Sequence, residues 1–279
     1  GGVLIEGGET LGNEDLMTQY SFLQIIMFFF VYCFLGWIWE TSYVSIRTRK
    51  FVNRGFLHGP LIPIYGFGAM VILFATLPVK DNLWLVFICG MLGASVLELV
   101  TGCTMEAIFH VRYWDYTNIP TNIKGYISLP TSIVWGFFSI LMIKFIHNPI
   151  EHMVLSLSET ATEVITVILV MFGSMDLGVS IRDALDLKEI LKHISEMESV
   201  QRAQKRMDVI AAVIDNDMEN FKDKISSRLT GLEKGEFRRI KSLLDRNPSA
   251  KSTKYSEMFE SFKSTIKELK RPGKNEESK

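Results

Sequence analysis

The sequence predicts an all-α protein, a polytopic bundle of five membrane-spanning helices followed by a charged cytoplasmic helical region. Two observations predict this fold class. Five apolar runs, each near the ~20 residues that a helix needs to cross a bilayer, alternate with short polar loops. The composition then becomes charged from about Ile181 to the end of the 279 residues. Soluble domains seldom contain so many long apolar runs, so we expect an integral membrane protein.

The predicted spans follow one another through residues 22–181. They cover Phe22–Trp39, Leu61–Leu77, Leu83–Val100, Leu129–Phe145 and Val164–Ser180. Residues 1–21 form a predicted extracytoplasmic segment, residues 182–270 a cytoplasmic helical domain and residues 271–279 a disordered end. The first run lacks a basic segment before it and ends in bulky tryptophans, which argues against a cleavable signal peptide. One re-entrant run is the alternative, in the long connection before Leu129.

Loop charges predict the orientation of the chain. The segment before the first run has four acidic residues and no Lys or Arg, whereas the next loop holds Arg47, Arg49, Lys50 and Arg54. Lys and Arg accumulate in cytoplasmic loops. We therefore expect the N-terminus outside and the C-terminus in the cytoplasm of a bacterial cell, with the chain in the plasma membrane.

Two stretches of the membrane region resemble each other. Val52–Gly66 (VNRGFLHGPLIPIYG) aligns with Asn122–Gly136 (NIKGYISLPTSIVWG), including Pro60 with Pro130. This similarity predicts two helical hairpins related as parallel repeats, an arrangement known among transporters. Recurring Gly and Pro at helix starts is the alternative explanation. We expect each proline to bend or break its helix, which frees backbone carbonyls.

Polar residues gather at the predicted cytoplasmic side. A carboxylate at membrane depth costs ~2.5–3.5 kcal/mol on insertion scales, so it faces protein or water and usually has a partner. Glu98 is the deepest, and it is interpreted either as an ion pair with Arg54 or Arg112 or as a binding or gating residue. The candidate inner-mouth site comprises Glu40, Arg54, His58, Glu98, Glu106, His110, Arg112, Trp114 and Asp115.

The segment Phe109–Tyr116 (FHVRYWDY) predicts a short amphipathic element at the inner interface. It is interpreted as a membrane anchor, a contact for a cytosolic partner or part of a substrate site. The histidines and glutamates lack the spacing of a known metal motif, and no nucleophile elbow or P-loop occurs. We therefore predict no enzyme activity, no catalytic residues, no cofactor, no metal and no nucleic-acid partner.

Three motifs together resemble a known bacterial membrane family. They are Arg54–Gly68 (RGFLHGPLIPIYGFG), Leu97–Tyr116 (LELVTGCTMEAIFHVRYWDY) and Asn122–Gly136. The family is described as Putative ABC-transporter type IV, and the resemblance covers about Phe22–Phe145. It implies the permease part of an ABC system and a separate ATPase subunit, and it assigns no site residue.

The charged C-terminal region, residues 182–279, is called the tail below. Met207, Ala211, Ile214, Met218, Phe221 and Ile225 form a heptad-like stripe, and Ile190, Ile194 and Met197 form another upstream. A long helix from Arg182 to Leu232 is predicted, with a register change around Gln201–Gln204. Shorter helices follow at Glu236–Asp245 and Tyr255–Leu269. An intramolecular helical hairpin, a homodimeric coiled coil and a partner-binding arm remain alternatives.

Three functions are consistent with these features. The leading prediction is a transporter permease-like subunit of unknown substrate within the lipid bilayer. The alternatives are a non-transporting scaffold or signalling protein that presents the tail, and a membrane-embedded enzyme in which Glu98→Gln would abolish turnover.

Overall fold

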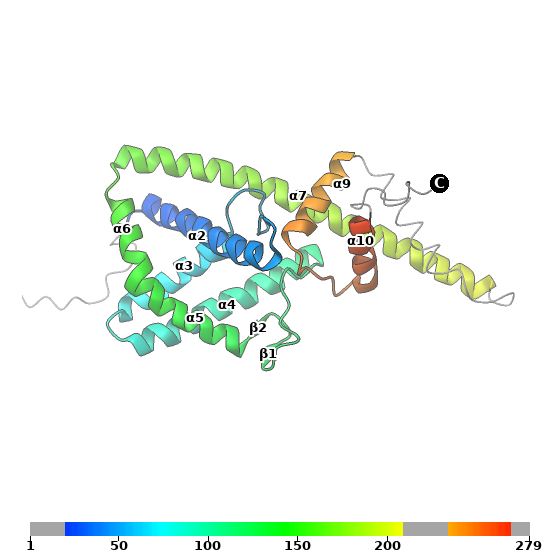
Figure 1. The fold of residues 1–279 in the computed structure, drawn as a ribbon, viewed down its shortest axis with the longest axis horizontal. Coiled ribbons are helices and arrows are strands. Elements are labelled where there is room, and N and C mark those ends of the chain that lie inside the picture. Colours follow the sequence, from blue (N-terminus) through cyan, green and yellow to red (C-terminus); the bar gives the residue numbers. More distant parts are fainter. Residues whose placement is uncertain (1–19, 209–233, 269–279) are drawn as a thin grey trace, which may run out of the picture. The chain divides into compact units, whose positions relative to one another are not determined.

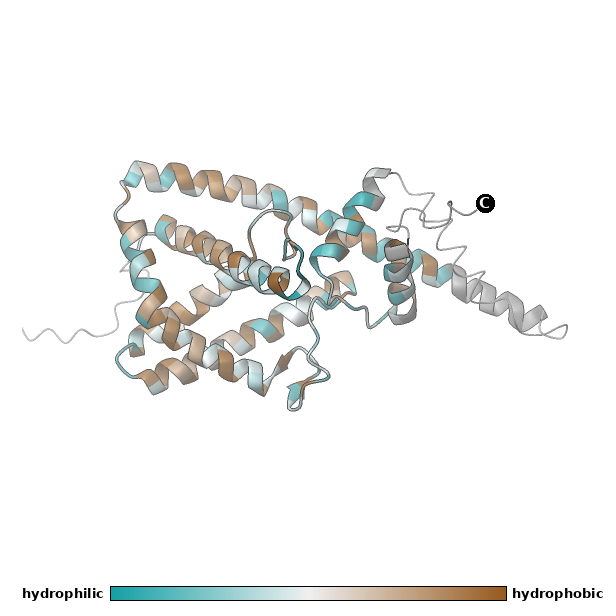
Figure 2. Cartoon of the chain, viewed as in Figure 1, coloured by the Kyte–Doolittle hydropathy of each residue, from teal (hydrophilic) through white to brown (hydrophobic). Residues whose placement is uncertain are grey.

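The computed structural model describes residues 20–208 and 234–268 and is mostly helical (Figure 1). Four of its helices are long and apolar enough to cross a membrane: Phe22–Thr48, Leu83–Phe109, Leu129–Leu155 and Glu159–Glu196. Apolar residues predominate along the first three of these helices (Figure 2). The prediction of a multi-pass helical membrane protein is therefore confirmed, with four of the five expected spans.

The span that is not confirmed is the second one. Helix α3 covers only Pro63–Thr76, and a 3-10 turn, η1, extends it through Leu77–Val79. Seventeen residues at 1.5 Å per residue give about 25 Å, short of a hydrocarbon core of about 30 Å. The preceding residues, Phe51–Ile62, form a loop in place of another helical turn.

Local sequence explains where α2 (Phe22–Thr48) begins and ends. Ser21 and Gln24 cap its start reciprocally, because the amide of Gln24 donates to Ser21 Oγ and the amide of Ser21 donates to Gln24 Oε1. At the other end Arg49 adopts a left-handed φ of 52°. The amides of Arg49 and Lys50 then donate to carbonyls of the last turn, which gives a Schellman-type stop.

Helix α4 (Leu83–Phe109) is capped by Asn82, whose Oδ1 accepts from the amides of Trp84 and Leu85. Between α4 and the next helix lies a small hairpin of β1 (Asn122–Ile123) and β2 (Ile127–Ser128). Lys124 and Gly125 have φ angles of 50° and 74°, so the hairpin turns through two left-handed residues.

Pro60 and Pro130 do not break helices. Pro60 precedes α3, and Pro130 is the second residue of α5 (Leu129–Leu141). Proline is tolerated in the first helical turn because the amides there have no intrahelical partner. The predicted helix breaks at these two residues are therefore wrong, and both prolines belong to helix starts.

Helix α5 continues through a π-helical turn, η2 (Met142–Ile146), into α6 (His147–Leu155). Helix α7 (Glu159–Asp208) is a single helix of 50 residues that contains the fifth predicted span. The long helix predicted for Arg182–Leu232 is thus described as far as Asp208, and the stripe from Met207 to Ile225 lies almost wholly outside the described residues. The predicted disordered end also lies outside them.

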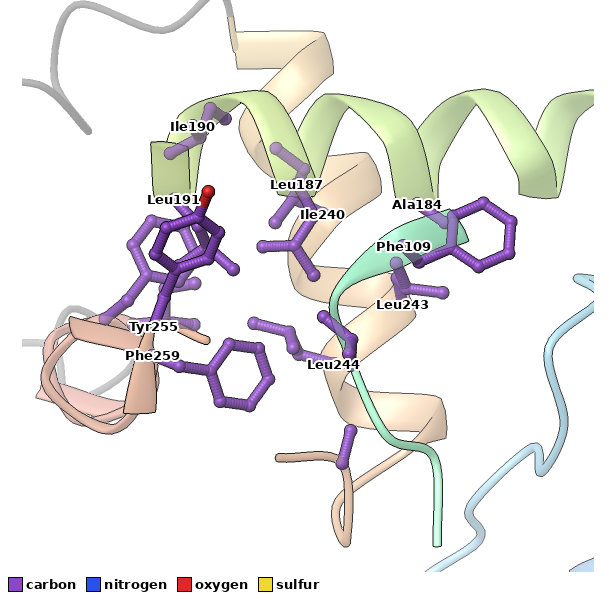
Figure 3. Close-up of a cluster of buried hydrophobic side chains, with 14 of the residues drawn as sticks. Phe109, Ala184, Leu187, Ile190, Leu191, Ile240, Leu243, Leu244, Tyr255 and Phe259 are labelled. Atoms are coloured by element: carbon purple, nitrogen blue, oxygen red, sulfur yellow. The ribbon is translucent and has the colours of Figure 1, made fainter. Parts of the chain in front are cut away.

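Two short helices complete the tail. Helices α9 (Lys234–Arg246) and α10 (Ser256–Glu268) agree with the two predicted short helices. Their apolar residues pack with Leu187, Ile190, Leu191 and Ile194 of α7 in one buried cluster (Figure 3). Ile190 and Ile194 of the upstream stripe are therefore covered within the chain, while a coiled coil between two copies stays a prediction.

The chain divides into two compact units. Unit 1 comprises residues 1–35, 63–97 and 129–171, and unit 2 comprises residues 36–62, 98–128 and 172–279. The predicted limit at residue 181, between a membrane domain and a cytoplasmic domain, does not correspond to these two units and stays a prediction. The core of unit 1 gathers around Phe28, Ile72, Leu73 and Met142, and that of unit 2 around Val111, Leu243, Phe259 and Phe262.

Candidate functional site

All nine residues of the predicted inner-mouth site lie in unit 2. They come from the C-terminal halves of α2 and α4, from the loop Phe51–Ile62 and from the segment after Phe109. The structure distributes them over three neighbouring groups of contacts within this unit. Each group joins a membrane helix to a residue far away in the sequence.

The first group contains Glu98 of α4, which is buried and only 6% exposed. The hydroxyl of Tyr116 donates to Glu98 Oε1 over 2.8 Å. Burial raises the pKa of Tyr116 above its ordinary value, and the charge of Glu98 raises it further, so this hydroxyl remains a donor. Tyr116 therefore supplies the hydrogen bond that a buried carboxylate at this depth requires.

Glu40 has a different partner. Arg54 Nε lies 3.5 Å from Glu40 Oε2, while the amide of Arg54 donates to Thr41 Oγ1. The guanidinium also donates through Nη1 to the carbonyl of Arg246 at the end of α9. Arg54 thus connects α2 with the tail through one side chain.

The second group surrounds His58 in the loop Phe51–Ile62. His58 Nδ1 lies 3.2 Å from Asp176 Oδ1 and 3.0 Å from Ser180 Oγ, and Nε2 lies 3.1 Å from Asp183 Oδ2. The amides of His58 and Gly59 donate to the two carboxylate oxygens of Asp176. These bonds satisfy loop amides that would otherwise need helical partners, so α7 holds the loop in its non-helical conformation.

Asp183 extends this group to α9. Its side chain is fully buried, and Arg239 Nε lies 3.2 Å from its Oδ1. Arg239 Nη2 also lies 3.4 Å from Asp186 Oδ2. Neither carboxylate oxygen of Asp183 has an aligned hydrogen bond. The carboxylate is therefore held mainly by the charge of the Arg239 guanidinium, and the imidazole of His58 lies against its other oxygen.

Arg246 is a second cation close to these acids, and unlike Arg239 it is buried, with 5% of the residue exposed. Its Nη2 donates to the carbonyl of Phe56 and its Nη1 to Ser242 Oγ. Burial lowers the pKa of Arg246, and the negative charges of Asp183 and Asp176 oppose this effect. The guanidinium thus joins α9 to the loop that carries His58.

The third group joins the end of α4 to the tail. Arg112 Nη2 lies 2.7 Å from Glu106 Oε2, and its guanidinium stacks over the ring of Tyr126. Lys251 Nζ lies 2.9 Å from Asp115 Oδ2. Arg112 and Lys251 also exchange two backbone hydrogen bonds as an isolated β-bridge. The tail therefore pairs directly with the segment that follows α4.

His110 and Trp114 are positioned by the same segment. His110 has a left-handed φ of 56°, and its carbonyl accepts from Ser252 Oγ. Burial lowers the pKa of His110, and the charges of Lys188 and Lys254 lower it further. Trp114 Nε1 donates to the carbonyl of Tyr126. The imidazole of His110 packs against the ring of Tyr255, with centroids 6.1 Å apart, so both side chains have structural partners in unit 2.

The segment Phe109–Tyr116 is largely irregular after the end of α4 at Phe109. Phe109 packs in the same buried cluster as α9 and α10 (Figure 3). Val111 and Tyr113 are buried in that cluster as well. Tail residues Ser249 and Ser252 donate to backbone carbonyls of this segment. The expected contact for a partner is thus covered in part by the chain's own tail.

Sequence reasoning missed several residues of these groups. Asp183, Ser180 and Arg239 were not among the candidates, although Asp176, Ser180 and Asp183 follow a helical spacing that places them on one face of α7. That spacing was a usable signal. The partner Arg239 carried no local signal, because it lies on a different helix.

Within the described part of the chain, no group of three or more His, Cys, Asp or Glu side chains is arranged to hold a metal ion. The chemistry that these groups present is the pairing of charges and hydrogen bonds between helix ends, a loop and the tail. Such contacts can hold helices in one arrangement and release them in another.

A model of the protein family described as Putative ABC-transporter type IV matches residues 27–181, which is more than half of the chain. The match begins in α2, includes α3 to α6 and ends in α7. No curated protein and no solved structure matches the chain significantly.

Proposed function

Because the chain belongs to the family described as Putative ABC-transporter type IV, we propose that it is a permease-like subunit of an ABC-type transporter. A separate chain supplies ATP hydrolysis in this proposal, since none of the 279 residues forms a P-loop motif. The chain itself is then not an enzyme. It resides in a bacterial plasma membrane, with its N-terminus outside and its C-terminus in the cytoplasm.

The observation that carries this proposal is the family match over the apolar helices, residues 27–181. The contacts of unit 2 add a physical argument. A transporter that is driven by a separate ATPase must pass a movement of its cytoplasmic surface to its membrane helices. Arg54, His58 and Asp115 contact the tail residues Arg246, Asp183 and Lys251, so the tail is the surface on which we expect the ATPase to act.

Affinity purification of the full chain from native membranes tests this proposal. We expect an ATP-hydrolysing chain to co-purify, and ATP-dependent solute flux after both chains are reconstituted in liposomes. Phe259→Ala should release the partner, because Phe259 is fully buried in the cluster that shapes the tail. Glu260→Gln is the matched control, because the neighbouring Glu260 side chain is 61% exposed.

Purification without any ATP-hydrolysing chain, together with no ATP-dependent flux, would contradict the proposal. Retention of the partner by Phe259→Ala, with the tail shown to be disordered by hydrogen exchange, would contradict only the assignment of the contact to the tail. The first result therefore tests the transporter proposal, and the second tests whether the ATPase binds the tail.

A non-transporting scaffold is a second candidate function. The observation that favours it is the β-bridge between Arg112 and Lys251, which joins the expected partner segment to the tail. In a scaffold, the exposed face of the tail binds the partner and Glu98 has only a structural role. Arg238→Glu on the exposed face of α9 should then abolish rescue of a deletion strain, while Glu98→Gln should rescue it fully.

Truncation at Arg182 does not separate these two functions. It would remove Leu187, Leu191 and the helices that cover Phe109, Val111 and Tyr113, and so expose a large apolar surface. Point substitutions preserve that core. Loss of rescue with Glu98→Gln would favour transport, because the scaffold gives Glu98 only a structural role.

A further inference from the structure

A buried histidine in unit 1 has no place in the function proposed above. His147 is the first residue of α6 and is 4% exposed. Its Nδ1 lies 2.9 Å from the hydroxyl oxygen of Tyr32, and its Nε2 lies 3.4 Å from that of Tyr20. Tyr20 Oη in turn donates to Glu151 Oε1 over 2.5 Å. Four side chains thus form one continuous hydrogen-bonded chain.

Local backbone structure places His147 in this position. Pro149 has no amide hydrogen and its ring would clash with the carbonyl of Phe145 in a regular α-helix. The chain meets this constraint with the π-helical turn Met142–Ile146, and the amide of His147 donates to the carbonyl of Met142. Turns of this kind recur at functional sites.

Aromatic rings enclose the imidazole. Phe28 and Tyr20 present edges to it, with centroids 5.3 and 6.2 Å away, and Tyr32 stacks at 6.4 Å. The residues Tyr20 and Tyr32 are 3% and 5% exposed. Glu151 is only half-buried, so it is the end of the chain that lies nearer to the surface of the unit.

The direction of each hydrogen bond follows from the acceptor at the end. An ionised carboxylate only accepts, so Tyr20 must donate to Glu151 and its oxygen is left to accept from His147 Nε2–H. Nδ1 then carries no proton and accepts from the Tyr32 hydroxyl. Burial raises the pKa of Tyr20 above its ordinary value, and the bond with Glu151 raises it further, so Tyr20 remains protonated.

We propose that Tyr32, His147, Tyr20 and Glu151 form a proton relay within the membrane region. A proton that arrives at the Tyr32 oxygen displaces the Tyr32 proton to His147 Nδ1. The Nε2 proton moves to the Tyr20 oxygen, and the Tyr20 proton moves to Glu151. One proton thus enters at Tyr32 and one proton is bound by Glu151, which becomes neutral. The donor and the acceptor exchange roles in every hydrogen bond of the relay.

The titratable groups that the structure places at His147 are Tyr32, Tyr20 and, through Tyr20, Glu151. The relay therefore links the protonation of Glu151 to the tautomer of His147. It holds whether the chain transports a solute or serves as a scaffold, because none of its residues belongs to unit 2.

Nuclear magnetic resonance of the full chain in lipid nanodiscs tests the relay. With ¹⁵N-labelled histidine, we expect His147 to carry its proton on Nε2 when Glu151 is ionised. As the pH falls, Nδ1 should become protonated with the same midpoint at which the infrared carboxyl band of Glu151 appears. His147→Gln and Glu151→Gln assign the two signals by their loss.

Tyr20→Phe removes the hydroxyl that joins the two groups while it keeps the ring. The two midpoints should then separate by half a pH unit or more. Exposed His152 on the same helix is the internal control, and its signals should not change in Tyr20→Phe. Thermal unfolding of each variant shows whether it remains folded.

Three results would overturn the relay. The first is an Nδ1–H tautomer in the wild type at high pH. The second is a His147 signal that stays constant while Glu151 becomes protonated. The third is a shared midpoint that persists in folded Tyr20→Phe. The first two need only the wild-type chain, so they decide the matter even if Tyr20→Phe does not fold.

Discussion

Asp183→Asn should loosen α9 from α7. The substitution keeps the shape of the side chain and removes its charge. In the wild type the fully buried carboxylate lies 3.1 Å from His58 Nε2 and 3.2 Å from Arg239 Nε. Asparagine leaves the guanidinium of Arg239 and the buried Arg246 without this counter-charge, and it can replace the contacts with His58 and Arg239 only weakly.

The expected magnitude lies between two limits. Breaking a buried ion pair by removing one partner costs about 3–5 kcal/mol, and an exposed pair contributes about 0.2–1 kcal/mol. The Asp183 side chain is 0% exposed, but those of His58 and Arg239 are 33% and 36% exposed. Solvent screens these partners in part, so we expect a loss of about 2 kcal/mol.

Hydrogen exchange of the α9 amides, Lys234–Arg246, measures this loss directly. A loss of about 2 kcal/mol in local opening free energy corresponds to about 30-fold faster exchange. Asp186→Asn is the matched control, because Asp186 contacts the same Arg239 at 3.4 Å and is 27% exposed. It should change the exchange by less than about threefold. Equal effects of the two substitutions, or unchanged exchange in Asp183→Asn, would refute the role of the buried carboxylate.

Two further predictions concern other parts of the chain. Burial raises the pKa of Asp115, but hydrogen bonds from Lys251 and from the backbone lower it to about 2 from an ordinary 3.8. A carboxyl group whose pKa is lower in the folded state stabilises that state above pH 3.8 and loses this effect as the pH falls toward 2. Acid unfolding followed by near-ultraviolet circular dichroism should therefore depend less on pH in this window for Lys251→Met, and identical curves would contradict the pairing. Gly136→Val should destabilise unit 1 by about 1–3 kcal/mol in denaturant unfolding, because an added Cβ would lie 2.6 Å from the ring of Phe87. Gly178→Ala, with no atom within 4 Å, should instead be neutral or stabilise by up to about 1 kcal/mol.

Apolar run length predicted the long helices well and α3 poorly. A hydropathy pattern records which residues prefer lipid, and this preference is strong in α2, α4 and α7. It does not record that the amides of His58 and Gly59 bond to Asp176, more than a hundred residues away. Because that tertiary contact satisfies the backbone outside a helix, α3 begins only at Pro63.

The candidate site stays a prediction, and the pairs of contacts among its residues could not be read from the sequence. Loop charge and depth placed Glu40, Arg54 and Glu98 together, and the structure has all of them in unit 2. The partners depend on how side chains meet across helices. Arg54 pairs with Glu40, and Glu98 accepts from Tyr116, which the sequence had not indicated as its partner.

In each hairpin of the predicted repeat, a glycine of the second helix packs against a phenylalanine of the first. Gly66 of α3 lies against the ring of Phe29, and Gly136 of α5 lies against the ring of Phe87. A Cβ at either glycine would meet the ring at less than 3 Å, so both positions require the smallest residue. The same contact between a glycine and a phenylalanine ring therefore joins the two helices of each hairpin.

The first helices of the hairpins agree with this correspondence. The interval from Phe29 to Glu40 equals the interval from Phe87 to Glu98, so the ring that packs on glycine and the acid near the helix end keep the same spacing. In both hairpins the acid meets a residue of the loop that leads to the second helix, Arg54 in one and Tyr116 in the other. Common ancestry and a common packing requirement both account for the spacing. In either case Glu40 and Glu98 are equivalent positions with different partners, so a functional role of Glu98 has to be judged against Glu40 as its internal reference.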